Sequence, residues 1–433
     1  MTAAGTASQI HRTIDAVWRI ESARLIAGLA RIVRDVGLAE ELAQDALVAA
    51  LEQWPESGVP RNPGAWLMAT AKHRAIDRLR RSRLLERKHA ELGREIEAGQ
   101  AAAVADLDAA IDAADAAKDD VGDDLLRLVF TACHPVLSSE ARVALTLRLL
   151  GGLTTGEIAR AFLVPEPTIA QRIVRAKRTL ADRRVPFEVP RGAELAARLS
   201  SVLEVIYLVF NEGYAATAGD DWMRPALCEE ALRLGRILAG LAPREPEVHG
   251  LVALMEIQAS RSRARAGPSG EPVLLMDQNR ARWDRVLIGR GLAALERSER
   301  LSGVRVRGPY ALQAAIAACH ARARTPEETD WTRIAALYAA LAQAAPSPVV
   351  ELNRGIAIAM AFGPAAGLEI VDALTAEPAL AGYHLLPSVR GDLLVRLGHQ
   401  DEAGKEFERA ASLTRNVRER ELLLARAAAC ATK

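Results

Sequence analysis

Aromatic residues are scarce in this 433-residue chain, at 4% of the sequence, although half of its residues are apolar. The buried cores must therefore consist mainly of alanine and leucine, a composition that favours closely packed helices. The formal net charge is only +1, so the whole molecule is not a polycation that binds nucleic acid without specificity. Any nucleic-acid-binding surface must be local. The length allows roughly two to four domains.

Cysteines and long apolar runs are also sparse. The four cysteines, Cys133, Cys228, Cys319 and Cys430, lie far apart and show no spacing typical of zinc ligands. We therefore expect no metal site and a reducing, cytoplasmic location. The N-terminus lacks the apolar core of a signal peptide, and no apolar run is long enough to cross a bilayer. No membrane partner is expected.

Motifs for covalent chemistry are missing as well. The eight histidines are scattered, and the sequence has neither a nucleophile motif nor a glycine loop that could hold phosphates. Cys133 and His134 are adjacent, but neighbouring residues on a helix point roughly 100° apart and are poorly placed to act as a pair. We predict a protein that is not an enzyme, with no catalytic residue and no cofactor.

The stretch from Gly152 to Leu180 has the pattern of two short helices joined by a tight turn, and Pro167 suits the first turn of the second helix. Helical spacing predicts a buried stripe made of Ile169, Ile173, Ala176 and Leu180. Other positions carry residue types that bond to base edges and phosphates, namely Thr168, Gln171, Arg172, Arg175, Lys177 and Arg178. A helix-turn-helix inserts such residues into the major groove of DNA. The alternative is an ordinary hairpin with a solvated basic face.

A second basic surface is predicted within residues 10–88, which have the periodicity of a compact helical unit. Gly37 is expected to end the first helix, and Asn62 to cap a third helix that begins at Pro63. Along that third helix we predict an apolar stripe of Trp66, Ala69, Ile76 and Leu79. Helical spacing also predicts a basic row of Arg74, Arg78 and Arg81.

The charge changes sign after this unit. Residues 61–88 hold nine basic and two acidic side chains, whereas residues 91–124 hold eleven acidic and two basic ones. We interpret residues 89–123 as an acidic linker. Residues 124–186 then form a second helical unit that ends in the helix-turn-helix, so the pattern up to this point is all-α.

The remaining residues, 187–433, also have helical periodicity. Near the end, Gly391, Ala403, Phe407 and Ala410 stand where tetratricopeptide repeats place these residue types, and Gly355 precedes Gly391 by 36 residues. We therefore predict a tetratricopeptide-like (TPR-like) stack of helical hairpins from about residue 305. Two polar motifs, residues 211–214 and 277–284, are candidates for contacts between domains, or for caps and turns, with Gly213 as a helix C-cap.

Both basic helical units, in this order and joined by an acidic linker, resemble bacterial RNA polymerase sigma factors of the extracytoplasmic-function (ECF) type. Residues 39–45 resemble the acidic helix that these proteins press against the polymerase, and residues 66–81 resemble their promoter-melting helix. Residues 156–178 resemble the helix-turn-helix of the σ4 domain, while residues 10–88 are similar to the σ2 domain. Residues 206–214 and 275–284 resemble a subgroup with a long C-terminal extension.

The resemblance implies roles for particular residues. Contacts with core polymerase are expected from Glu41, Gln44, Asp45 and Glu52. Contacts with the −10 element are expected from Arg61, Asn62, Lys72, Arg74, Arg78 and Arg81, where Arg61 and Asn62 border a flipped-base pocket. The residues of the helix-turn-helix named above would contact the −35 element. The clamp and flap of the polymerase and promoter DNA are the implied partners.

The C-terminal extension would regulate activity in this subgroup, with a regulatory protein, for example a YCII-like (DGPF) protein, as its expected partner. The linker would thread a polymerase channel and imitate the phosphate charge of RNA, unless it is a plain solubilising linker. His73 departs from the usual asparagine, and we expect it to pack. The rival hypothesis is a helix-turn-helix regulator with a TPR-like scaffold that acts without core polymerase, and co-purification with the polymerase would separate the two.

Overall fold

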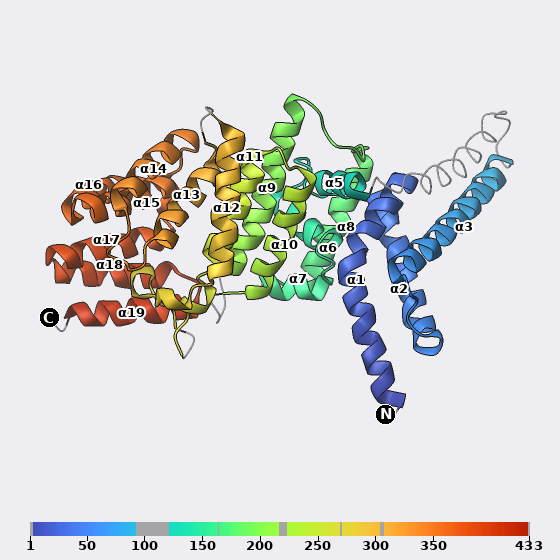
Figure 1. Cartoon of the computed structure of the whole chain (residues 1–433), viewed down its shortest axis with the longest axis horizontal. Coiled ribbons are helices and arrows are strands. Elements are labelled where there is room, and N and C mark those ends of the chain that lie inside the picture. The colour runs from blue at the N-terminus through green and yellow to red at the C-terminus, as the bar shows by residue number, and fades with distance from the viewer. Residues whose placement is uncertain are drawn as a thin grey trace. The chain divides into compact units, whose positions relative to one another are not determined.

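The computed structural model describes residues 3–91, 121–162, 164–215, 223–268, 271–303 and 307–431. Within these ranges the chain is helical and forms no strand, apart from one isolated bridge between Ala266 and Pro272. The predicted all-α class is therefore confirmed. The chain divides into two compact units, Met1–Val205 and Ile206–Lys433, whose helices are labelled in Figure 1. Most of the predicted acidic linker lies outside the described residues.

Three long helices begin the first unit: α1 (Ala3–Val33), α2 (Val36–Ser57) and α3 (Pro63–Glu91). The Asn62 side chain accepts a hydrogen bond from the Ala65 N–H at 3.1 Å, which confirms the predicted cap of α3. The prediction for Gly37 is wrong, because α1 already ends at Val33 and Gly37 lies in the first turn of α2. Asp35 caps α2 by accepting a hydrogen bond from the Leu38 N–H at 2.8 Å.

The buried stripe of α3 also differs from the prediction. Leu67, Ala71 and Ala75 are each at most 2% exposed, whereas Ala69 is exposed and Trp66 is only half-buried. The Trp66 ring packs edge-on against Trp54 at a centroid distance of 5.3 Å. The buried row of α3 is therefore Leu67, Ala71 and Ala75, and Trp66 packs on Trp54 outside this row. The side chain of Leu79 is outside the described part.

The rest of the first unit contains α5 (Val121–Ala132), α6 (Ser139–Leu149), α7 (Thr155–Phe162), α8 (Glu166–Asp182) and the start of α9 (Ala193–Tyr214). A capping box begins α7: the Glu157 N–H donates to the Thr154 hydroxyl at 3.1 Å, and the Thr154 N–H donates to the Glu157 carboxylate at 2.8 Å. Pro167 lies in the first turn of α8, as predicted. The predicted stripe Ile169, Ile173, Ala176 and Leu180 is buried.

In the second unit, proline starts several helices at the breaks between them, because its missing N–H is not needed in the first turn. The helices are α10 (Pro225–Leu241), α11 (Pro246–Ala259), α12 (Arg285–Ser302), α13 (Pro309–Arg322), α14 (Trp331–Ala344), α15 (Pro348–Phe362), α16 (Pro364–Ala373), α17 (Leu385–Leu397), α18 (Gln400–Leu413) and α19 (Val417–Ala431). Most residues of α11 and α13 are buried. Both helices therefore lie in the interior of this unit.

Glycines allow successive helices near the C-terminus to approach closely. A Cβ atom at Gly391 of α17 would lie 2.7 Å from the Phe407 ring of α18, and one at Gly355 of α15 would lie 3.1 Å from Val371 of α16. Phe407 is 1% exposed, and Figure 1 shows α17, α18 and α19 side by side. Equivalent glycines thus serve successive hairpins, although the tetratricopeptide assignment itself stays a prediction.

The two polar motifs make local contacts within the second unit. Asp284 caps α12 by accepting hydrogen bonds from the Val286 and Leu287 N–H groups, at 2.9 and 3.1 Å. Arg280, which is 5% exposed, donates to the carbonyls of His320 and Ala323 at 2.9 and 2.8 Å, and so caps the end of α13.

The alternative reading, in which Gly213 is a helix C-cap, is wrong. Gly213 lies inside α9, and a Cβ atom there would lie 2.6 Å from the backbone nitrogen of Cys228. The neighbouring Tyr214 hydroxyl accepts a hydrogen bond from Arg261 at 2.7 Å.

Candidate nucleic-acid interface

The second helix of the α7–α8 pair exposes one continuous face. Gln171, Arg175 and Arg178 are exposed, and Val174 between them is 63% exposed. Thr168 and Arg172 are half-buried at the edge of this face. Sequence reasoning missed Val174, although its spacing of three from Gln171 and four from Arg178 places it on the same side. An exposed apolar residue there can contact a thymine methyl group in the major groove.

Lys177 lies on a different side of α8 from the other predicted DNA-binding residues. Its ammonium group forms an ion pair with Glu40 of α2, whose side chain is 3% exposed. The same carboxylate accepts a hydrogen bond from Arg148 Nε at 2.6 Å and one from Gln44 at 2.5 Å. One buried carboxylate thus connects α2 with both α6 and α8.

Two of the predicted −10 contacts pair with predicted polymerase contacts. Arg78 of α3 lies 2.9 Å from the Glu41 carboxylate of α2. Arg74 donates a 2.5 Å hydrogen bond to the backbone carbonyl of Asp45, and its guanidinium lies 3.9 Å from that residue's carboxylate. All four side chains are substantially exposed, with relative exposures from 38% to 56%. The acidic face of α2 and the basic row of α3 therefore adjoin.

The other −10 candidates are more dispersed. Arg61 and Asn62 are exposed in the turn before α3, and Lys72 is half-buried. The side chain of Arg81 lies outside the described part of the chain. His73 is exposed, so the expectation that it packs is wrong. Its side chain is available beside the basic row.

The predicted polymerase-binding face of α2 contains exposed apolar residues among its polar ones. Glu41, Asp45 and Glu52 are exposed, and Gln44 is half-buried because it contacts Glu40. Val48 and Leu51, which the sequence analysis did not single out, are 48% and 36% exposed. Their helical spacing from Gln44 and Glu52 is the signal that could have revealed them.

The cysteines are buried, and each is a free thiol. Burial raises the pKa of Cys133 to about 11 and that of Cys228 to about 12. The described residues contain no group of three His, Cys, Asp or Glu side chains that could hold a metal ion. No helix among the described residues is long and apolar enough to span a membrane.

Two regions of the first unit match known protein families. The model of Sigma-70 region 2 matches residues 20–84, and that of Sigma-70 region 4 matches residues 127–180. These two regions define a sigma factor, a DNA-binding protein of transcription initiation that is not an enzyme.

Related proteins agree with this class. The chain is 31% identical over 162 residues to the ECF RNA polymerase sigma factor SigK of Mycobacterium ulcerans. The aligned region is 36% of this chain and 78% of SigK. It is also 26% identical over 179 residues to the probable ECF RNA polymerase sigma factor SigI of Mycobacterium tuberculosis. This aligned region is 41% of the present chain and 58% of SigI. The chain therefore belongs to the ECF family of RNA polymerase sigma factors.

The region after the helix-turn-helix has its own matches. Residues 198–299 match a family of unknown function, DUF6596. An uncharacterized protein of Rhizobium meliloti is 43% identical over 395 residues, which covers 91% of this chain and 90% of that protein. The similarity to this relative thus includes most of the C-terminal extension.

Proposed function

We propose that the first unit starts transcription through three helical surfaces: α2 binds core polymerase, α3 binds the opened −10 element, and α8 reads the −35 element. The observation that carries the proposal is the exposed face of α8, where Gln171, Val174 and Arg175 combine an amide, an apolar group and a cation. Hydrogen-bonding, apolar and charged contacts are those by which a helix in the major groove reads base pairs and fixes its register.

Polymerase docking is assigned to α2 because its exposed face has the composition of a protein interface. Val48 and Leu51 supply apolar area, and Glu41, Asp45 and Glu52 surround it with negative charge. Partly apolar patches with a charged rim are typical of transient protein interfaces, and the rim charges mainly set the association rate and the choice of partner. The expected partner surface is basic with an apolar centre.

Promoter opening is assigned to α3 because its arginines are held in place by exchangeable partners. Exposed ion pairs such as Arg78–Glu41 contribute only about 0–1 kcal/mol. A DNA phosphate can therefore replace the carboxylate at little cost. The carboxylates released on α2 then become available to the polymerase, so binding of the two partners is mutually favourable in this proposal.

The pairing of Lys177 with Glu40 suggests that this structure is the form that precedes promoter binding. A lysine at this site can contact a −35 phosphate only after it leaves Glu40. We infer that α8 moves relative to α2 when both promoter elements are bound.

The C-terminal extension is proposed to regulate these activities. Support comes from its size and from the match of its first part to a separate family. The identity of a regulatory partner stays a prediction.

The function is tested by purifying the full chain with core polymerase and by transcription from the chain's own promoter. We expect co-purification and promoter-dependent RNA synthesis. If the chain binds promoter DNA alone but never joins the polymerase, the rival hypothesis of a regulator that acts without core polymerase is correct.

A further inference from the structure

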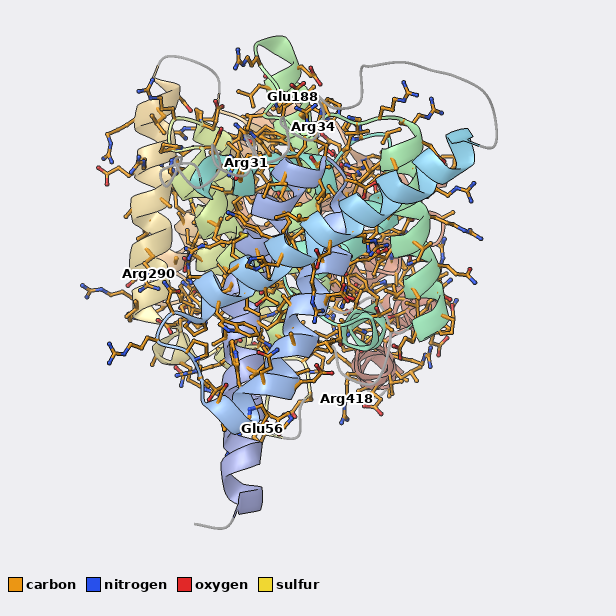
Figure 2. The ribbon with its side chains drawn as sticks, turned by 90° about the vertical axis from the view of Figure 1, so that its right-hand side faces the viewer. Arg31, Arg34, Glu56, Glu188, Arg290 and Arg418 are labelled. Carbon is orange, nitrogen blue, oxygen red and sulfur yellow. The ribbon has the colours of Figure 1, made fainter. Side chains whose placement is uncertain are left out.

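A cavity of about 620 Å³ lies within the first unit where α1 ends, α2 begins and α8 ends. Its lining includes Arg31 and Arg34 from the end of α1, Lys177 from α8, and Arg184 and Glu188 from the segment after α8. Figure 2 shows Arg31, Arg34 and Glu188 gathered near one another, far from Glu56. A cavity of this size is within the range that holds small-molecule ligands.

Two arginines of the lining have an unusual backbone conformation. Arg34 and Arg184, with φ of 54° and 47°, are the non-glycine residues with positive φ among those that the structure describes. Each follows the end of a helix, and the Arg34 N–H donates to the Ala30 carbonyl at 2.8 Å, while the Arg184 N–H donates to the Ala181 carbonyl at 2.9 Å. Glycine adopts this conformation without steric cost, whereas a residue with a Cβ atom is strained in it.

Both strained residues line the same cavity. Strained backbone of this kind concentrates at functional sites. A role for the two side chains would explain why arginine occupies positions that suit glycine.

The charges of the lining leave these two guanidinium groups available. Arg31 lies 2.8 Å from the Asp124 carboxylate, and Lys177 is paired with Glu40. Arg34 and Arg184 are exposed and form no ion pair within the described part of the chain. Of the two carboxylates in the lining, that of Asp35 caps α2, and that of Glu188 is exposed and forms no ion pair among the described residues. Arginine forms paired, charge-assisted hydrogen bonds with phosphate as well as carboxylate oxygens, so two such groups suit an anion with several oxygens such as a phosphate chain.

Part of the lining is apolar. Leu180, Val185, Pro186 and Phe187 all contribute to it. An aromatic ring next to arginines can stack on a nucleobase while the cations hold phosphates. A bare phosphate would leave this part of the cavity without a partner.

We propose that this cavity binds a small nucleotide that carries two or more phosphates, with Arg34 and Arg184 on the phosphates and Phe187 at the base. Because the lining combines the ends of α1 and α8, such a ligand would favour the arrangement in which Lys177 remains with Glu40. Binding itself does not depend on the sigma factor activity.

The proposal is tested by calorimetric titration of the full chain with ADP, GDP, inorganic pyrophosphate and adenosine. We expect one equivalent of each nucleoside diphosphate to bind, pyrophosphate to bind more weakly, and adenosine not to bind.

Arg34→Gly and Arg184→Gly should each weaken diphosphate binding about tenfold or more, since each removes a charge-assisted contact. Without ligand, both variants should melt at the same temperature as the natural chain or higher, because glycine relieves the strain. Arg183→Ala, which removes a neighbouring exposed arginine, is the control and should bind normally.

Three outcomes would overturn the proposal. They are no heat of binding with any diphosphate at millimolar concentration, unchanged binding in the Arg34→Gly/Arg184→Gly double variant, and loss of affinity for duplex DNA without loss of diphosphate binding in that variant. The last outcome would assign the two arginines to the DNA backbone. If a glycine variant melts at a lower temperature, Arg34→Asn and Arg184→Asn, which also tolerate positive φ, provide the same comparison.

Discussion

Glu40 of α2 and Lys177 of α8 form an ion pair in which the glutamate side chain is 3% exposed. Arg148 of α6 binds the same carboxylate. The pair joins the helix proposed to bind polymerase to the helix proposed to read DNA. Since both cations share this carboxylate, Glu40 links α2 to α6 and to α8 at one point.

Replacing Glu40 with alanine should destabilise the first unit by about 2–3 kcal/mol, because Lys177 and Arg148 would lose their partner in a partly buried site. Lys177→Ala should cost less, about 1 kcal/mol, since Arg148 still neutralises Glu40. Urea unfolding followed by circular dichroism measures both values. Glu41→Ala, which breaks an exposed pair in the next residue, is the control and should change stability by less than about 1 kcal/mol. Equal effects at positions 40 and 41 would contradict the assignment.

The Arg78–Glu41 pair should separate DNA binding from polymerase binding. Arg78→Ala should weaken binding of the holoenzyme to opened promoter DNA, whereas Glu41→Gln should weaken binding to core polymerase and leave the arginine free. Each effect is expected to be about 1–2 kcal/mol, since each removes one contact at an exposed surface. Fluorescence anisotropy with labelled DNA and with labelled core polymerase gives the two affinities. The assignment fails if both variants affect the same assay in the same way.

Residues on α8 should differ in the kind of DNA contact they make. Arg172→Ala should cost roughly 1–3 kcal/mol of binding to the natural promoter and relax preference at one base pair. Arg175→Ala, which removes an exposed arginine of the same face, should weaken binding to all sequences alike and reduce the salt slope by about one unit. Holoenzyme binding to promoter variants at several salt concentrations tests this. An unchanged promoter affinity for Arg172→Ala would remove that residue from the site.

Shortening the chain should have effects that depend on where it ends. The start of α9 packs within the first unit, where Arg198 donates to the Phe130 carbonyl at 2.9 Å and the Ser201 hydroxyl donates to the Cys133 carbonyl at 2.7 Å. A chain that ends after Pro186 loses these contacts and should unfold at a lower temperature than one that ends after Val205.

Transcription with the longer of these two chains then tests regulation by the extension. Higher activity than that of the full chain would mean that the extension inhibits, and lost activity would mean that it is required. Equal activity of the full chain and the chain that ends after Val205 would contradict a regulatory role of the extension. The shorter chain alone could not decide the question, because its first unit is damaged.

The stability of the second unit should depend on pH through His320. Burial, helped by the positive charges of Arg261 and Arg280, lowers the pKa of His320 to about 3. The unfolded chain takes up a proton near pH 6.5 and the folded chain only near pH 3, so the free energy of unfolding falls as the pH drops from 6.5 towards 3 and is unaffected by His320 above pH 6.5. Between pH 6 and 5, the free energy of unfolding of the natural chain should change with pH more steeply than that of His320→Asn, by up to about 1.4 kcal/mol per pH unit. Unfolding curves at the two pH values measure it, and equal slopes in both chains would refute the assignment.

Features that depend on neighbouring residues could be predicted from the sequence. The buried stripe of α8 and the Asn62 cap follow from spacing within one helix and from one side-chain hydrogen bond. The expected end of the first helix was wrong because Arg34 and Asp35, and not Gly37, provide the local termination. The predicted stripe of α3 was wrong by one position: Leu67, Ala71 and Ala75 are buried, and Trp66 contacts Trp54 while only half-buried.

Contacts between distant segments could not be predicted in this way. Helical spacing places Glu40 on the buried side of α2, four residues after Val36 and three before Ala43. It does not reveal the partners that satisfy the buried carboxylate, because Arg148 and Lys177 lie more than a hundred residues away. For the same reason the sequence predicted Lys177 as a phosphate ligand without revealing its pairing with Glu40. The cavity at the end of α1 also depends on segments that only the fold brings together.

The ion pairs between α2 and α3 mean that carboxylates of this sigma factor neutralise some of its predicted DNA-binding arginines before DNA is bound. When Arg78 exchanges Glu41 for a phosphate, the protein uncovers a negative charge in the same step, so less net charge is transferred to the DNA than the number of arginines suggests. Fewer mobile cations are then displaced from the duplex. Promoter affinity should accordingly vary less steeply with salt than it would for an unpaired arginine row, until the polymerase covers the released carboxylates.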